Sequence, residues 1–222
     1  MIRANKKLVA FVCIRLNNER LPGKNLLELG GHPLYFWIFS ELKKLKEIDE
    51  IYLYSSSIEE FSQLPEGILW EKRDLEYDNN VSCGELLKSF CKIIESDFYL
   101  LAHATSPFTQ AKTLHSMIEA FSESKTHDSA VTGSSINSFA WQSGKPVNFD
   151  PTDIKRTQDM NPYFIENVGG YIFSKEQILE FNRRVGESPL LWEVPLIETI
   201  DIDSLKDYKF AKSIEHILIE RQ

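Results

Sequence analysis

A short polar segment near the N-terminus, Arg15–Asn25, carries the residue types best suited to binding a phosphate. It follows the apolar run Leu8–Ile14, which is typical of a strand buried on both faces of a parallel sheet. A loop that leaves the carboxyl end of such a strand can bring backbone N–H groups and cationic side chains onto an anion. The cations of this segment are Arg15, Arg20 and Lys24. The segment has neither a P-loop pattern nor the dinucleotide fingerprint, so a solvated loop with scattered charges is the alternative interpretation.

Apolar runs and helical stretches alternate along most of the chain and would position this loop. The predicted strands are Leu8–Ile14, Ile51–Tyr54, Phe98–Ala102, Ala130–Thr132 and Tyr171–Phe173, with an extended segment at Val194–Ile202. The predicted helices run from Pro33 to Lys46, from Ser82 to Glu95, from Thr109 to Ser122, onward from Ser174, and after Asp203. Ser82 and Ser174 have the spacing of a capping box, and Thr109 is the expected cap of its own helix. The alternation predicts an α/β fold with a mainly parallel sheet flanked by helices.

The regular pattern stops between residues 137 and 165, which contain prolines and aromatics but little periodicity. We expect a single domain over residues 1–222, with this stretch as a protruding arm within it. An irregular stretch of about thirty residues in a compact domain usually serves a function or an interface. Aromatic residues are enriched at the centres of interfaces, so the arm is a candidate contact surface.

The composition excludes several classes of protein. Of 222 residues, 42% are hydrophobic and 26% charged, which argues against a disordered chain. The 25 Lys and Arg against 33 Asp and Glu give a net charge of −8, which argues against a nucleic-acid partner. No apolar run approaches the ~18 residues of a membrane span. The cysteines Cys13, Cys83 and Cys91 lack metal-site spacing and are expected to be buried or half-buried free thiols, as in a cytoplasmic protein.

The polar loop reads Arg-x-x-x-x-Arg-Leu-Pro-Gly-Lys-Asn and resembles the signature loop of the sugar nucleotide cytidylyltransferases. That family includes the acylneuraminate cytidylyltransferases (CMP-sialic acid synthetases) and the CMP-Kdo synthetases. Five further stretches resemble the family in the same order: Lys72–Asp74 with Asp78–Ser82, Leu101–Phe108, Arg156–Asp159, Glu166–Phe173, and Ile200–Asp203 with Asp207 and Phe210. Together the six segments span nearly the whole chain.

The resemblance implies a Rossmann-like nucleotidyltransferase fold and a CTP-dependent enzyme. Its second substrate would be an eight- or nine-carbon 2-keto sugar acid, and its products a CMP-sugar for cell-surface glycan synthesis and pyrophosphate. Such a displacement at phosphorus depends on positioning and charge neutralisation more than on covalent help from the protein. Family members are usually homodimers joined through the irregular arm, so a homodimer is expected here.

The same resemblance assigns residues to the nucleotide. They are Arg15, Arg20, Lys24, Asn25, Arg73, Asn80 and Ser82. Arg15 and Lys24 are the expected triphosphate ligands and catalytic cations, with Arg20 as a weaker third. Helix capping alone would explain Ser82.

Asp201 and Asp203 are the expected metal ligands and acidic catalytic residues. If the chain is extended there, residues spaced i and i+2 face the same side. Two carboxylates at one site suit Mg²⁺, which can bridge a triphosphate and a sugar acid. The alternative interpretation is a helix N-cap with a second acidic residue beside it; Asp203 can fill both roles.

The sugar-acid side is assigned to a third group of residues. They are His103, Thr105, Ser106, Arg156, Gln158, Tyr163 and Asn167. The residues from His103 to Ser106 leave the third strand at its carboxyl end, where the sugar acid is expected, although His103 can also be an ordinary loop histidine. The guanidinium of Arg156 suits a carboxylate.

Three departures from the family pattern indicate a divergent branch. Glu19 stands where sialic acid enzymes commonly have a lysine, His103 replaces a glutamine, and Val168 replaces a glycine. We therefore expect an unusual sugar acid, either a sialic-acid-like sugar such as legionaminic or pseudaminic acid, or a Kdo-like sugar. Two alternatives stay open: a transferase that uses another nucleotide, and a catalytically weak binding protein that kept the fold.

Overall fold

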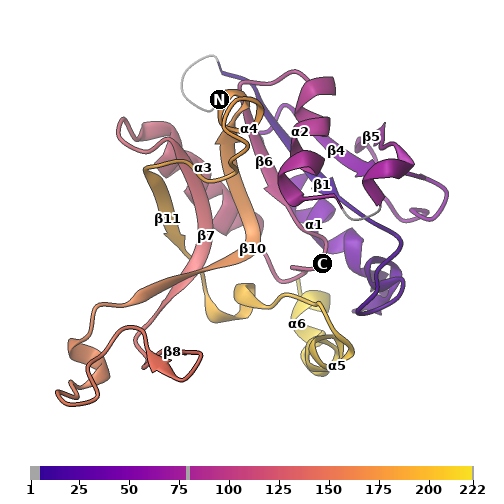
Figure 1. Ribbon diagram of the computed structural model, residues 1–222. Helices are drawn as coiled ribbons and strands as arrows, with labels where there is room; N and C mark the ends of the chain where they lie inside the picture. Colours follow the sequence, from indigo (N-terminus) through magenta and orange to yellow (C-terminus); the bar gives the residue numbers. More distant parts are fainter. Residues whose placement is uncertain (1–5, 79–80, 222) are drawn as a thin grey trace.

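A computed structural model of the chain describes residues 6–78 and 81–221 (Figure 1). The main sheet of these residues has seven strands in the order β11–β7–β10–β6–β1–β4–β5. The strands are β1 (Leu8–Cys13), β4 (Glu50–Ser55), β5 (Leu69–Lys72), β6 (Phe98–Ala102), β7 (Ser129–Ile136), β10 (Tyr163–Ser174) and β11 (Pro189–Glu193). Neighbouring strands are parallel except at β10, which runs antiparallel to both β6 and β7. The predicted mainly parallel α/β fold is confirmed.

Helices cover both faces of this sheet. α1 (Leu34–Leu42) and α3 (Ala111–Glu123) lie on one face, and α2 (Cys83–Ile93) and α4 (Lys175–Leu179) on the other. Two further helices, α5 (Leu205–Ser213) and α6 (His216–Ile219), belong to the C-terminal segment. Along β1, Ala10 packs into the core shared with α1 and α3, whereas Phe11 packs into the core shared with α2 and α4. The unbroken apolar run of β1 therefore follows from burial on both faces. None of the helices in the described part of the chain combines the length and apolarity needed to cross a membrane.

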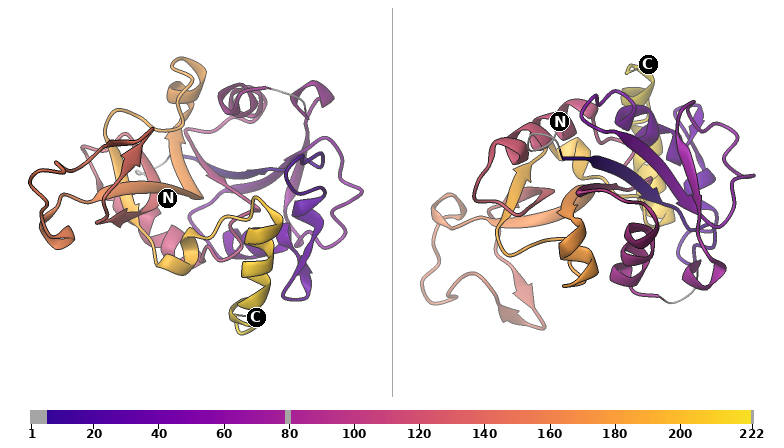
Figure 2. Two further views of the ribbon diagram at one scale, coloured as in Figure 1. Left: turned by 60° about the horizontal axis from the view of Figure 1, so that its bottom comes forward. Right: turned by 90° about the horizontal axis from the view of Figure 1, so that it is seen from above.

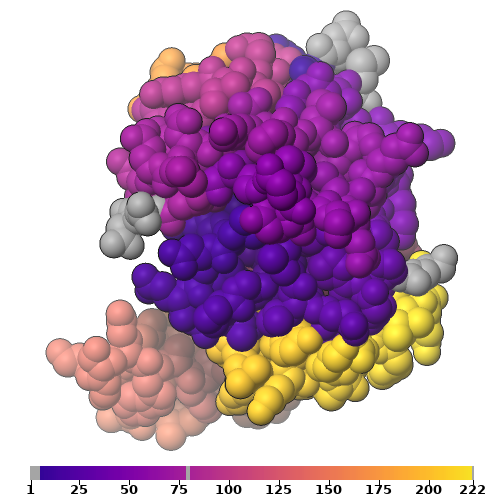
Figure 3. Space-filling model, turned by 90° about the vertical axis from the view of Figure 1, so that its right-hand side faces the viewer, coloured from indigo at the N-terminus to yellow at the C-terminus, as the bar shows by residue number. Residues whose placement is uncertain are grey.

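The C-terminal segment packs against the N-terminal third of the chain, as the contact of yellow and indigo surfaces in Figure 3 shows. A third hydrophobic cluster joins Leu21 of the first loop to Ile202 and Leu218 of this segment. The Tyr208 hydroxyl also donates to the carbonyl of Glu28, at 2.6 Å, in the short hairpin of β2 (Glu28–Leu29) and β3 (His32–Pro33). Residues about 180 positions apart in sequence are thereby held together near the first loop.

The irregular stretch forms an arm that projects from the end of β7 and β10 (Figure 2). These strands pair as far as Ile136 and Tyr163, and the chain between them forms the arm. It contains a hairpin of β8 (Trp141–Gln142) and β9 (Lys145–Pro146) and the 3₁₀ turn η3 (Thr157–Asp159). The predicted arm is present, but its last residues, 163–165, belong to β10.

The structure differs from the predicted elements at several points. β5 and β11 are edge strands that no sequence pattern indicated, because most of their residues are exposed or half-buried. Residues 194–202 are not extended throughout, because the 3₁₀ turn η4 (Leu196–Thr199) interrupts them. The helix expected from Pro33 to Lys46 ends at Leu42.

Two of the three predicted helix caps are confirmed. Ser82 and Ser174 both form complete capping boxes. Thr109 does not cap α3, which begins at Ala111; Gln110 occupies the cap position, and its side chain makes no capping hydrogen bond. The first N–H groups of α3 instead donate to carboxylates brought from elsewhere: Gln110 N to Glu198 and Ala111 N to Glu41.

Candidate active site

Two adjoining hollows lie beside the loop that follows β1, at the carboxyl end of the parallel strands. Their volumes are about 520 and about 440 Å³. Residues Arg15, Asn18, Arg20, Lys24 and Asp203 line both, and the second also contains Asn25, His103, Thr105 and Asp201. The predicted site residues that the structure brings together are Arg15, Arg20, Lys24, Asn25, His103, Thr105, Asp201 and Asp203.

Asp203 lies between two cations of the first loop. Its carboxylate contacts Lys24 Nζ at 2.7 Å and Arg20 Nη1 at 2.8 Å. Gly23, at a φ of 63°, permits the turn into η1 (Lys24–Leu26), a backbone conformation that other residues adopt only with strain. The helix that follows Asp203 is capped by Ser204 rather than by Asp203, so the carboxylate of Asp203 is directed to the cations.

Asp201 carries a buried carboxylate oxygen, Oδ1, with no hydrogen-bond partner among the described residues. Burial raises the pKa of Asp201, and the neighbouring charge of Asp203 adds to this, while a hydrogen bond from the Thr105 side chain opposes it. The backbone is fixed at the same point, because Ile202 N donates to Thr105 O at 2.9 Å. An unpaired buried acceptor is costly, so Oδ1 is available to a cation or a donor that enters the second hollow.

These two carboxylates could hold a hard cation. Both line the second hollow, and carboxylate oxygens are the protein ligands that Mg²⁺ prefers. The described residues contain no group of three or more histidine, cysteine or acidic side chains placed to hold a metal. A cation at Asp201 and Asp203 would therefore take its other ligands from water or from a bound substrate.

Arg15 and Asn25 hold the loop in shape. Asn25, which is buried, donates from Nδ2 to the carbonyl of Arg15 at 3.1 Å. Arg15 Nη2 reaches Val81 O at 3.4 Å, just before α2. Arg15 thus spans the opening between β1 and α2 while its side chain lines both hollows.

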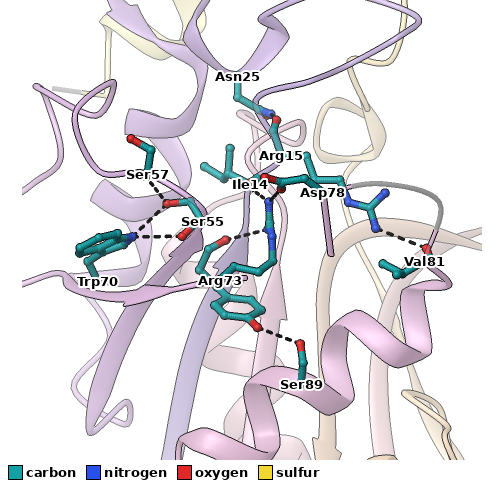
Figure 4. A network of polar contacts seen from close by, with 11 residues as sticks. Ile14, Arg15, Asn25, Ser55, Ser57, Trp70, Arg73, Asp78, Val81 and Ser89 are labelled. Carbon is teal, nitrogen blue, oxygen red and sulfur yellow. Dashed lines mark hydrogen bonds and ion pairs between the residues drawn. The ribbon is translucent and has the colours of Figure 1, made fainter. Parts of the chain in front are cut away.

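Arg73, predicted to contact the nucleotide, is fully buried and lines neither hollow. Figure 4 shows its guanidinium between the ends of β1 and β4, where Nη2 donates to Ile14 O at 2.9 Å and Nη1 to Tyr54 O at 3.1 Å. It also forms an ion pair with Asp78, which lines the first hollow. Arg73 is buried there because a guanidinium supplies several donors at once, enough for two carbonyls at the strand ends and for Asp78.

The prediction that Ser82 contacts the nucleotide gains no support from the geometry. Ser82 caps α2, accepting from Glu85 N at 3.2 Å, and is exposed outside both hollows. The capping interpretation of Ser82 is therefore sufficient. Asn80 lies outside the described residues.

His103 lines the second hollow in one defined hydrogen-bonding state. Its Nδ1 lies 3.0 Å from Val168 O, and because a carbonyl only accepts, Nδ1 carries the proton. Burial, helped by the charge of Arg184, lowers the pKa of His103 to about 4, so the ring is neutral at physiological pH. Nε2 is then an acceptor that makes no hydrogen bond within the described residues.

Arg184, which lies near His103 and the second hollow, was not identified from the sequence. Arg184, in the loop after α4, stacks over the Tyr171 ring at 4.1 Å and lies 3.6 Å from Glu166. It also donates to Cys83 Sγ at 3.7 Å. No local pattern marks Arg184, because its partners lie in α2 and β10, two parts of the chain that are distant from it in sequence. Cys83 lines the second hollow and is exposed, which corrects the expectation of buried or half-buried thiols.

Two predicted sugar-binding residues lie inside the protein. Ser106 is 1% exposed, and its backbone N–H closes a turn onto His103 O at 3.2 Å. Asn167 is buried and donates from Nδ2 to Glu198 O at 2.7 Å, while its Oδ1 has no partner in the described part of the chain. Neither residue lines the two hollows. Both therefore lie behind the site rather than in contact with a ligand bound there.

Three more lie outside the two hollows: Arg156 and Gln158 on the arm, and Tyr163 at the start of β10, where the arm ends. Arg156 and Gln158 are exposed, and Arg156 pairs with Asp159 at 2.7 Å. Tyr163 lines a separate hollow on the arm. The reason is geometric: β7 and β10 extend beyond the sheet, so the segment between them projects away from the carboxyl ends of the parallel strands (Figure 1).

Comparisons with known proteins agree with the fold and identify the family. The chain is 24% identical over 222 residues to N-acylneuraminate cytidylyltransferase A of Danio rerio, covering 95% of this chain but 51% of the relative; it therefore spans about half the length of that protein. It is 26% identical over 231 residues to CMP-N,N′-diacetyllegionaminic acid synthase of Legionella pneumophila, covering 94% and 96% of the two chains.

Solved structures share the fold at low sequence identity. A CMP:2-keto-3-deoxy-manno-octonic acid synthetase complexed with CTP aligns over 97% of this chain and 100% of its own, with a TM-score of 0.68 and 13% identity. A 4-diphosphocytidyl-2C-methyl-D-erythritol synthase from Anaerococcus prevotii aligns over 95% and 96%, with a TM-score of 0.64 and 16% identity. Residues 9–220 match the sequence model of the cytidylyltransferases. That match includes every residue that lines the two hollows, and the chain belongs to the cytidylyltransferase family.

Proposed function

We propose that this protein transfers the CMP group of CTP to a 2-keto sugar acid and releases pyrophosphate. One observation carries the proposal: cations of the first loop and two carboxylates from the C-terminal segment line the same hollows. Cations suit a triphosphate, and the carboxylates suit the metal ion that accompanies it. Family membership supports CTP as the nucleotide.

The geometry indicates how the residues would act. Arg15, Arg20 and Lys24 would neutralise the phosphates as a sugar hydroxyl attacks the α-phosphorus and the bond to the departing pyrophosphate breaks. Asp201 and Asp203 would hold Mg²⁺, which supplies charge neutralisation at the phosphates when bound. Asp203 would then exchange its contacts with Lys24 and Arg20, leaving both cations to the nucleotide.

The sugar acid proposed is a sialic-acid-like sugar, such as legionaminic or pseudaminic acid, or a Kdo-like sugar. The relative from Legionella pneumophila, whose name includes diacetyllegionaminic acid, supports the first class because it aligns over nearly its full length. The acceptor Nε2 of His103 in the second hollow would favour a hydroxyl or amide N–H on the sugar.

We expect CTP with Mg²⁺ to raise the melting temperature more than UTP, GTP or ATP, and pyrophosphate to appear once a suitable sugar acid is added. A ligand that binds only the folded state stabilises it by about 2.7 kcal/mol at one hundred times its dissociation constant. Thermal shift with the four nucleotides, followed by a pyrophosphate assay over a panel of sialic-acid-like and Kdo-like sugars, measures both steps.

Each outcome of that pair of measurements is informative. A rise with CTP but no pyrophosphate with any sugar acid would favour a nucleotide-binding homologue without catalysis. Glu19 motivates this second candidate, because it places an anion in the lining of the first hollow. A preferential rise with another nucleotide would reject CTP as the substrate.

We also propose that the protein is a homodimer joined through the arm. Phe139 and Trp141 are 38% and 59% exposed, and each packs on Phe149, at ring-centroid distances of 4.7 and 5.1 Å. Such an exposed aromatic cluster is typical of an interface centre. Light scattering at micromolar concentration is expected to give about twice 25.7 kDa, and Trp141→Ser to shift the mass toward the monomer. A wild-type mass near 25.7 kDa would reject the dimer.

A further inference from the structure

Glu198, in η4, is a buried acidic residue to which the proposed reaction gives no role. It is 1% exposed and lies three positions before Asp201. Its carboxylate accepts from Thr113 Oγ1 at 2.7 Å, Gln110 Nε2 at 3.0 Å and Gln110 N at 3.1 Å. Burial raises the pKa of Glu198, and these hydrogen bonds oppose the rise. The carboxylate therefore ties the segment before Asp201 to the start of α3.

The same segment is fixed at two further points. Its backbone carbonyl at Glu198 accepts from Asn167 Nδ2 of β10 at 2.7 Å. Ile202 N donates to Thr105 O, in the loop between β6 and α3, at 2.9 Å. Among the described residues, Glu198 is thus the only one of residues 198–203 whose side chain forms a hydrogen bond with the start of α3. The two backbone bonds attach the same residues to β10 and to the loop after β6.

We propose that Glu198 is a positioning residue that sets the location of Asp201 and Asp203 in the second hollow. This inference rests on the proposed function, since it concerns the carboxylates that would hold the metal ion there. The orphaned Oδ1 of Asp201 can serve a ligand only if the backbone at 198–203 stays where the α3 contact places it. Residues that hold metal ligands in place typically change metal affinity or activity by about 10–100-fold when they are removed.

The chain provides a matched control for this role. Glu41 of α1 is 8% exposed, and its Oε2 accepts from Ala111 N at 2.7 Å, at the next N–H of the same helix. Both carboxylates therefore satisfy neighbouring N–H groups at the start of α3, and both complement its dipole. Only Glu198 belongs to the segment that carries Asp201 and Asp203. Glu198→Gln and Glu41→Gln should lower the melting temperature by similar amounts, whereas only Glu198→Gln should affect the metal site.

The test measures CTP binding by calorimetry in EDTA and then over a range of Mg²⁺ concentrations, for wild type, Glu198→Gln and Glu41→Gln. We expect Glu198→Gln to raise the Mg²⁺ concentration that half-maximally strengthens CTP binding by about 10–100-fold. Its CTP affinity in EDTA should stay close to that of wild type, because the cations of the first loop are untouched. Glu41→Gln should follow wild type in both conditions.

The outcomes separate this inference from the proposed function. Wild-type metal dependence in Glu198→Gln, or an equal change in Glu41→Gln, would leave Glu198 with a structural role alone and overturn the inference. A wild-type protein that binds no CTP would overturn the proposed function and this inference with it. If Glu198→Gln does not fold, Thr113→Val removes one of the bonds to Glu198 and should shift the metal dependence in the same direction, by a smaller factor.

Discussion

Asp201→Asn is expected to lower kcat for CMP transfer by about 10²–10³-fold, the effect of removing one group that stabilises transition-state charge. The amide has the shape of the carboxylate but not its charge, and it presents N–H donors where a cation would need an acceptor. Because Asp201 Oδ1 is already buried without a hydrogen-bond partner among the described residues, the substitution breaks no hydrogen bond at that atom. Steady-state kinetics of pyrophosphate release at saturating CTP and Mg²⁺ measure the effect.

Asp97→Asn is a suitable control for Asp201→Asn. Asp97 lies before β6, at the amino end of that strand, where it accepts from Lys7 N at 2.9 Å and pairs with Lys6 at 2.7 Å. Its loss should change stability slightly and leave kcat unaltered. A kcat for Asp201→Asn within about twofold of wild type would show that the buried carboxylate takes no part in the reaction.

Local patterns predicted the parts of the fold that depend on neighbouring residues. The apolar run of β1 predicted a strand buried on both faces, and the capping boxes at Ser82 and Ser174 are both present. The start of α3 was mispredicted because its donors bind Glu41 and Glu198, which lie 70 and 88 positions away in sequence. The direction of β10 is likewise set by its pairing with β6 and β7, for which no local pattern exists.

The part of the candidate site that could be predicted consists of residues in a recognisable motif beside the end of a strand. Arg15, Lys24 and Asp203 follow directly from the loop after β1 and from the acidic pair before α5, and they line common hollows. Residue type alone was misleading for Arg73, since a cation after a strand can serve buried carbonyls as well as a ligand. The placement of His103 against Val168 and of Arg184 over Tyr171 depends on tertiary contacts, which sequence spacing does not encode.

Arg73→Met is expected to destabilise the protein by about 3–5 kcal/mol, the usual cost of removing one partner from a buried ion pair. The thioether would fill part of the space but donate to none of the groups that now accept from the guanidinium (Figure 4). Ile14 O would then lose the guanidinium donor, Tyr54 O would keep only the bond from Ile14 N, and Asp78 would lose its counter-charge. Urea unfolding followed by tryptophan fluorescence measures the change.

Arg156→Met provides the matched comparison, because it removes the same side chain from an exposed ion pair. Arg156 and Asp159 are 74% and 46% exposed as side chains, compared with 0% and 17% for Arg73 and Asp78. Water replaces lost contacts on the arm but cannot reach the strand ends, so Arg156→Met should leave the free energy of unfolding nearly unchanged. Equal losses in the two variants would contradict the assignment of Arg73 to the interior. A large loss confined to Arg73→Met, with Arg73→Lys intermediate, would support it, since lysine keeps the charge but not the planar donor geometry.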